Sequence, residues 1–345
     1  MPRVACMPHI TGTADFRLLN DWQRDFPLLP RPFAHIGEVV GATEQAVIDA
    51  YRGWVAAGVV SRVGAVFAPR RIGVGALVAL AVAPERLEAV AARVSAEPCV
   101  NHNYEREHAF NLWFVVTAPD ADALTRIVGG IERDTACKAI CLPMEEEFHI
   151  DLGFDLTGLA RKCRVDVSTR HAAATEPACA LPDLDRRLFT ALQGGLPIVP
   201  APWDVLGRRV GLSEGMVLET VERGLAEGLI RRFGVVVRHH ELGIGTNAMC
   251  VWDIPDPLAS EVGRRLALEP AVTLCYRRKR GAPDWHYNLF CMIHGSARDA
   301  VLAVRDELAQ RLRLDQWPHT VLFSGRRFKQ GGAHYLPMAP ETGND

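Results

Sequence analysis

The sequence lacks the segments that mark a membrane or secreted protein. No stretch approaches the roughly eighteen consecutive apolar residues of a membrane span, and the N-terminal "MPRVACMPHITGTADF" contains no continuous apolar run of secretory length. The nine cysteines are odd in number and include no CxxC pair, so a disulfide framework is not expected. These absences predict a cytoplasmic protein with reduced thiols.

The sequence also lacks a strong net charge. Its 345 residues carry 39 Lys and Arg against 41 Asp and Glu, so no overall basic field exists to hold nucleic acid or an anionic membrane. Hydrophobic residues make up 48% of the chain, which is typical of a globular protein, and the length allows two domains or more. Any anion-binding site must therefore be local.

Two homologous halves make up the chain. The stretch "GVVSRVGAVFAPRRIGVGALVALAV" from Gly58 aligns without a gap with "GLIRRFGVVVRHHELGIGTNAMCVW" from Gly228, at an offset of 170 residues. Further on, "EPCVNHNYERE" (97–107) matches "EPAVTLCYRRK" (269–279), and "AFNLWFVV" (109–116) matches "HYNLFCMI" (286–293). Residues 157–181, which are rich in Ala, Thr and Arg, indicate a linker.

Each half predicts a helical block followed by alternating strands and helices. Residues 14–60 and 182–230 have a helix-turn-helix pattern, with Gly211 at the turn and Ser213 as the N-cap of the next helix. Residues 61–156 and 231–335 follow a β-α-β-β-α-β order, for which the second half indicates strands at 246–253, 272–279, 285–294 and 319–324, and helices at 256–268 and 297–312. The expected fold class is α+β, a tandem repeat of a winged helix-turn-helix plus a ferredoxin-like βαββαβ domain.

The helix-turn-helix outline suggests DNA binding, and the charge of its second helix tests that interpretation. A recognition helix needs cations to neutralise phosphates and to reach base edges. The relevant helices are acidic, with Glu214, Glu219, Glu222 and Glu227 against Arg223 in the second half, and Glu44 and Asp49 against Arg52 in the first. We therefore expect no DNA binding and a role in packing or dimer contacts. A ligand-responsive transcription regulator is the alternative.

Cationic and aromatic residues collect in the second half. The stretch "RRFGVVVRHHELG" (231–243) places three arginines and two adjacent histidines on a Val-rich strand, for which a solvated edge strand is the simpler interpretation. "YRRKR" (276–280) and "WHYNLF" (285–290) are expected to pair as a hairpin. Arginine binds carboxylates and phosphates, aromatic rings supply flat apolar faces, and histidine donates protons or ligates iron. This set suits a planar ligand with several carboxylates, or alternatively a nucleic-acid strand.

The first half keeps this framework with different side chains. "VNHNYEREHAFNLW" offers His102, Tyr104, Arg106 and His108, and "SRVGAVFAPRR" offers Arg62 but neither member of the histidine pair. The two halves therefore need not do the same job.

These features resemble the Lrp/AsnC architecture. Through "VNHNYEREHAFNLWF", "RRFGVVVRHHELG" and "YRR…WHYNLF" the chain resembles the enzymatic branch of that family, the sirohaem decarboxylases, over nearly its whole length outside the termini and linker. The tandem arrangement is similar to the fused form of haem d1 synthesis. The resemblance implies removal of the C12 and C18 acetate carboxylates of sirohaem as CO2, with no cofactor besides the iron tetrapyrrole substrate. It also implies that the halves form a pseudo-dimer, and it leaves further homo-oligomerisation open.

The resemblance and the residues together define an expected site. The candidate proton donors are His239, His240, His286 and Tyr276, and His286 is also the candidate ligand of the substrate iron. Cations would hold the carboxylates that stay on the macrocycle. The candidate substrate-binding residues are Arg231, Arg232, Arg238, Arg277, Arg278, Lys279, Trp285, Tyr287, Arg62, His102, Tyr104, Arg106 and His108. A carrier that binds sirohaem without changing it is a third interpretation, and the sequence does not say which half is active.

Overall fold

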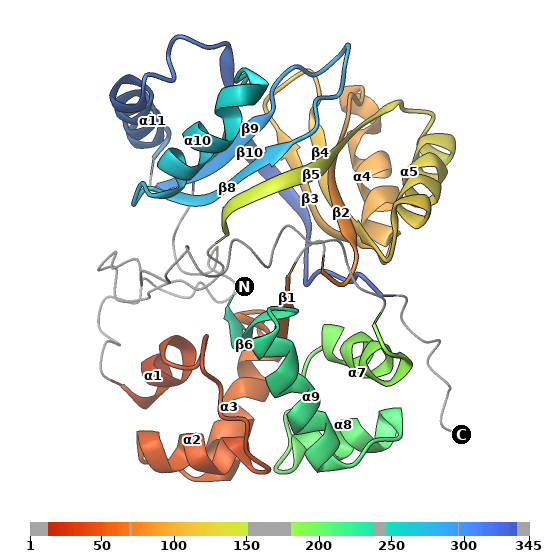
Figure 1. Ribbon diagram of the computed structural model, residues 1–345, viewed down its shortest axis with the longest axis vertical. Coiled ribbons are helices and arrows are strands. Elements are labelled where there is room, and N and C mark those ends of the chain that lie inside the picture. The colour runs from red at the N-terminus through yellow and green to blue at the C-terminus, as the bar shows by residue number, and fades with distance from the viewer. Residues whose placement is uncertain (1–12, 69–70, 151–180, 238–245, 296, 337–345) are drawn as a thin grey trace. The chain divides into compact units, whose positions relative to one another are not determined.

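The computed structural model describes residues 13–68, 71–150, 181–237, 246–295 and 297–336. Contacts between residues divide the chain into two compact units (Figure 1). The helical unit falls within Met1–Gly73, Gly153–Leu242 and Gly332–Asp345, and the barrel unit is made of Val74–Leu152 and Gly243–Gly331. Each unit therefore contains part of both sequence repeats.

The helical unit contains two copies of the predicted helix-turn-helix. Its elements are α1 (Ala14–Asn20), α2 (Pro32–Val40), α3 (Glu44–Ala56) and β1 (Val60–Phe67), followed in the second half by α7 (Asp183–Gln193), α8 (Pro202–Val210), α9 (Glu214–Ala226) and β6 (Ile230–Val237). Gly41 and Gly211 end α2 and α8 in the left-handed conformation that glycine adopts without strain. Thr43 and Ser213 cap α3 and α9 by accepting a backbone N–H bond. The turn at Gly211 and the N-cap at Ser213 are confirmed.

The strands that follow the two helix-turn-helix modules pair with each other. β1 and β6 run antiparallel and form a two-stranded sheet within the described residues. Apolar side chains of both strands, Phe233 among them, belong to the same hydrophobic core as the helices. The sequence predicted that the ferredoxin-like domains begin at residues 61 and 231, which would place these strands in those domains. In the structure the barrel unit begins later, at Val74 and Gly243, because β1 and β6 bury their apolar faces with the helices.

The barrel unit confirms the predicted β-α-β-β-α-β order in each half. The first half supplies β2 (Val74–Leu80), the 3₁₀ turn η1 (Pro84–Arg86), α4 (Leu87–Ala96), β3 (Val100–Arg106), β4 (Leu112–Ala118), α5 (Ala121–Thr135) and β5 (Ala139–Ile150). The second half supplies β7 (Thr246–Trp252), α10 (Asp256–Ala267), β8 (Val272–Arg278), β9 (Leu289–Gly295), α11 (Arg298–Leu312) and β10 (His319–Gln330).

The two halves pair through their sheets, as expected of a pseudo-dimer. In the described part of the chain the strands close into a barrel in the order β10-β3-β4-β2-β5-β8-β9-β7. The last strand of each half is shared, because β5 pairs with β8 and β10 pairs with β3. Figure 1 shows α4 and α5 outside the strands of the first half, and α10 and α11 outside those of the second. Closure into a single barrel leaves no exposed sheet edge between the halves.

Two sequence expectations need correction in this unit. β9 begins at Leu289, and not at Trp285, because Trp285 forms only an isolated bridge with Gly281 in the turn between β8 and β9. The partners of Tyr276 and Arg277 are consequently Phe290 and Leu289. The gapless alignment also fails, since β2 begins at residue 74 and β7 at residue 246, so the second half has two extra residues between β6 and β7.

Apolar side chains fill both faces of the barrel wall. The outer faces pack under the helices in two separate clusters, one for each half. A third cluster occupies the inside of the barrel and includes Trp113, Tyr276, Trp285 and Phe290. No described helix is long and apolar enough to span a membrane.

Candidate functional site on the inner face of the barrel

Strand β3 directs three of the predicted residues to the inside of the barrel. Its alternate residue Asn103 points outward, where its amide donates to the carbonyl of Ala91 and to the Ser95 hydroxyl on α4. Side chains alternate along a strand, so His102, Tyr104 and Arg106 face inward. Arg106 is 8% exposed, and its Nη1 donates to the carbonyl of Leu322 in the inner cluster at 3.0 Å.

The second half places an equivalent pair on β8. Tyr276 and Arg278 match Tyr104 and Arg106, and Nη1 of Arg278 donates to the carbonyl of Leu142 at 2.9 Å. The Arg278 guanidinium also lies over the Tyr276 ring, 4.5 Å from its centroid. Both arginines thus stabilise the seam between the halves as well as lining the barrel.

Strand β10 adds two inward-facing residues that the sequence reasoning missed. Arg327 lies opposite Tyr104 and Gln330 lies opposite His102 in the β3–β10 ladder, and Nη1 of Arg327 donates to Oε1 of Gln330 at 3.0 Å. The signal was present in the repeat, because "GRRF" (325–328) stands where the first half has "EEEF" (145–148). None of the residues predicted for the site lies beyond residue 287, so the last strand of the second half was not included.

Burial shifts the pKa of two side chains in this row, His102 and Tyr104. It lowers the pKa of His102 to about 4, so the imidazole is neutral at pH 7. Nδ1 of His102 lies 2.6 Å from Oδ1 of Asn101; because an amide oxygen only accepts, Nδ1 carries the proton and Nε2 keeps its lone pair. Burial raises the pKa of Tyr104, opposed by the nearby cations Arg327 and Arg106. The row therefore offers a neutral imidazole, a phenol and guanidinium groups.

The predicted cation cluster at the end of β8 is largely paired with acids. Arg277 forms ion pairs with Glu145 at 3.0 Å and Asp256 at 3.2 Å. Its neighbour Arg280 pairs with Asp253 and Asp256, and hydrogen bonding to Arg280 is the main reason why the pKa of Asp256 lies below its ordinary value. Of the predicted cations here, Lys279 has an exposed side chain.

The predicted residues Trp285, Tyr287 and His108 gather in one aromatic cluster. Trp285 is buried and packs edge-on against Trp113, Tyr287 and His108, at centroid distances of 4.9, 5.0 and 5.5 Å. Trp285 and His108, which occupy equivalent positions in the two halves, are therefore in contact within one cluster. His286 has an exposed side chain, and its carbonyl accepts from Nε of Arg280.

The remaining predicted residues belong to the helical unit or lie outside the described residues. Arg232 is buried and its Nη1 donates to the carbonyls of Gln23 and Val235. Arg62 donates to the carbonyl of Ala65 at 3.0 Å, and burial lowers its pKa to about 10. Arg231 is half-buried on β6. Arg238, His239 and His240 fall outside the described residues.

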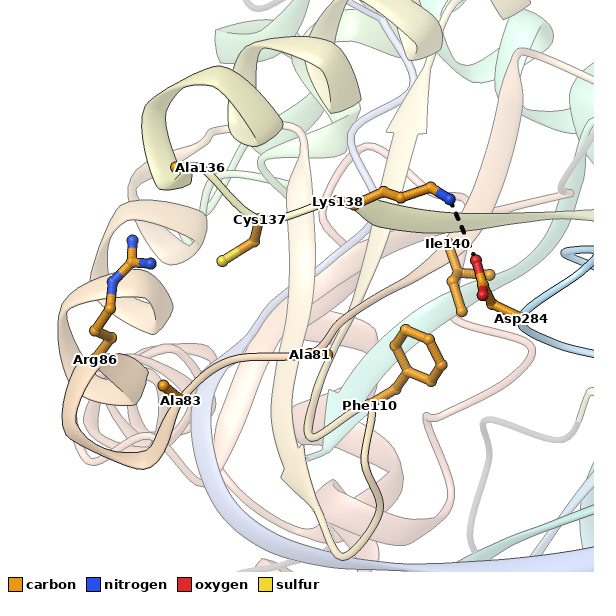
Figure 2. Close-up of a pocket in the computed structure, with 9 residues that line it drawn as sticks. All are labelled: Ala81, Ala83, Arg86, Phe110, Ala136, Cys137, Lys138, Ile140 and Asp284. Atoms are coloured by element: carbon orange, nitrogen blue, oxygen red, sulfur yellow. Dashed lines mark hydrogen bonds and ion pairs between the residues drawn. The ribbon is translucent and has the colours of Figure 1, made fainter.

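A hollow of about 470 Å³ lies elsewhere in the barrel unit, beside the start of β5 (Figure 2). Its two cations already have partners, since Lys138 pairs with Asp284 at 3.3 Å and Arg86 donates to the carbonyl of Thr135. The described residues that line it include none of the predicted set. We therefore place the candidate site on the inner row of β3 and β10. No cluster of three metal-binding side chains occurs among the described residues.

The fold and the inner row define the class as a tandem AsnC-like protein. Residues 71–149 and 241–329 match the family model described as "AsnC-like ligand binding domain". Residues 15–60 and 185–231 match the model described as "Siroheme decarboxylase NirDL-like HTH domain".

Full-length relatives specify the family. The chain is 41% identical to the "Siroheme decarboxylase NirDL subunit" of Paracoccus pantotrophus, over 94% of this chain and 98% of that protein. It is also similar to a crystal structure of the siroheme decarboxylase NirDL, with a TM-score of 0.68, 27% identity and coverage of 94% and 95%. A second NirDL structure, a co-complex with an iron-uroporphyrin III analogue, matches with a TM-score of 0.66, 27% identity and coverage of 93% of each chain. The chain belongs to the sirohaem decarboxylase family.

Proposed function

We propose that this chain is a carboxy-lyase that removes the C12 and C18 acetate carboxylates of sirohaem as CO2, giving didecarboxysirohaem for haem d1 synthesis. The observation that carries the proposal is the 41% identity to a named sirohaem decarboxylase along almost the entire length of both proteins. The inner row supports it, because an imidazole, a phenol and guanidinium groups suit a carboxylated macrocycle. We infer that the reaction takes place in the cytoplasm, where the nine cysteines stay reduced.

The reaction needs a proton donor and no redox partner. Breaking the bond between the carboxylate and the methylene carbon leaves an electron pair on that carbon, which the conjugated macrocycle accepts. An acid then delivers one proton to the carbon, and the acetate becomes a methyl group. No electrons are gained or lost overall, so we propose that the protein requires no cofactor beyond the iron of its substrate.

The side chains divide between holding the substrate and supplying the proton. Carboxylates that stay on the ring are held by cations, while the scissile carboxylate occupies a less cationic place, because an ion pair would stabilise it in the ground state. His239 and His240 are the first candidates for the acid. His102 is neutral at pH 7 and is therefore a candidate for the substrate iron alongside His286, through the lone pair on Nε2.

One experiment tests the reaction and separates it from its alternatives. The purified protein is incubated anaerobically with sirohaem, and the mass of the tetrapyrrole is followed with time. Two successive losses of CO2 are expected. Binding with a spectral change but an unchanged mass would identify a carrier, and an unchanged mass together with salt-sensitive retention of specific DNA would identify a regulator.

A further inference from the structure

The barrel has two pseudo-equivalent inner walls that face the same end. The strand order repeats after four positions, so β3 and β10 on one side correspond to β8 and β5 on the other. We call His102, Tyr104 and Arg327 the first wall, and Leu274, Tyr276 and Glu147 the second wall. Tyr104 lies opposite Arg327 and Tyr276 lies opposite Glu147 in matching ladders. Each wall takes one strand from each half of the chain.

The outward-facing positions next to these walls have exchanged their charges in pairs. On the first side, Nε of Arg326 bonds Glu105 at 2.6 Å. On the second side Arg277 and Glu146 occupy the matching positions with the signs reversed, and Nε of Arg277 forms an ion pair with the neighbouring Glu145 at 3.0 Å. Each pair stays complementary, so the outward charge difference between the halves is satisfied inside the protein.

The inward-facing positions have also diverged in sequence. Arg327 on the first wall corresponds to Glu147 on the second, while the residue opposite is a tyrosine in both. His102 likewise corresponds to Leu274. Because the tyrosines match, the arginine gives the first wall a cation where the second wall has a carboxylate. Nε of the buried Arg106, next along the first row, also has no hydrogen-bond partner among the described residues.

We propose that the first wall holds a carboxylate of an iron tetrapyrrole through Arg327 and Tyr104, and that the second wall repels a carboxylate through Glu147. The pseudo-twofold arrangement of the barrel would otherwise allow a macrocycle to bind in two orientations. Opposite charges on the walls select one of them, which makes Arg327 a specificity-determining residue. The inference deepens the proposed function and rests on it for the identity of the ligand.

Binding of iron-uroporphyrin III, followed by its absorbance, tests the proposal on the full-length protein. Arg327→Gln should weaken binding about tenfold to a hundredfold, which is the usual effect of losing a hydrogen bond to a charged group. Arg327→Lys should restore part of the affinity. Arg326→Gln is the matched control, since it removes a neighbouring arginine that faces outward, and it should bind within about twofold of the wild type. Glu147→Gln should bind at least as tightly as the wild type.

The outcomes separate this inference from the proposed function. Unchanged affinity in Arg327→Gln, or an equal loss in Arg326→Gln or Glu147→Gln, would overturn the wall assignment even if the wild type releases CO2 from sirohaem. Loss of affinity confined to Arg327→Gln would support it even if the wild type leaves the mass of sirohaem unchanged, in which case only the reaction is wrong. Matching circular dichroism spectra and unfolding midpoints of the variants exclude misfolding as the cause.

Discussion

His102 should make the native protein sensitive to mild acid, and His102→Leu should remove that sensitivity. Leucine is the residue at the corresponding position of the second half, Leu274. Burial lowers the pKa of His102 from 6.5 to about 4, so the unfolded chain takes up a proton at a higher pH than the folded chain does. The stabilisation is complete above pH 6.5 and is lost progressively as the pH falls to 4. Its size is about 3 kcal/mol by pH 4.

Urea unfolding at pH 7 and at pH 4 measures this effect. The free energy of unfolding of the wild type should fall between the two pH values by about 3 kcal/mol more than that of His102→Leu. His286→Leu removes an exposed histidine of the same unit and should follow the wild type. If the wild type and His102→Leu lose the same stability, His102 is not held neutral by burial, and its part in the site must be revised.

Three further predictions concern the acid, the seam and the helical unit. The double variant His239→Ala/His240→Ala should abolish CO2 release, measured by product mass, while absorbance titration shows sirohaem binding largely intact. Arg106→Met removes the buried hydrogen bond from Nη1 to the carbonyl of Leu322 and should lower the free energy of unfolding in urea by about 1–3 kcal/mol. Gly234→Ala places a Cβ against two carbonyl oxygens and should lower the melting temperature, whereas Gly53→Ala meets open space in a helix and should raise it slightly.

The element order was predictable because it depends on local patterns. Glycine turns, N-caps and the change from helical to alternating periodicity can each be recognised within a few residues of sequence. Gly211 ends α8 and Ser213 caps α9, as expected. The closed barrel was not predictable in the same way, since it depends on β5 and β10 crossing to the other half. The sequence of neither strand indicates which strand of the other half it pairs with.

The candidate site was predictable in its residue types and less so in its members. Arginine density in "YRRKR" indicated anion binding, yet Arg277 and Arg280 pair with acids on β5 and near α10. The number of cations in one segment does not show that acidic residues from other segments will neutralise them in the fold. Arg327 was missed for the complementary reason, because the repeat shows an arginine in place of Glu147 but does not show that β10 lies beside Tyr104.

The tandem arrangement explains why the walls can differ at all. A barrel built from two identical chains would have identical walls by symmetry, so a cation at one wall would be repeated at the other. Joining two diverged halves in one chain removes that constraint, and the barrel then carries Arg327 on one side and Glu147 on the other. Since β3 pairs with β10 and β8 with β5, neither half forms a wall alone. We therefore expect the candidate site to depend on the pairing of the halves rather than on either half alone.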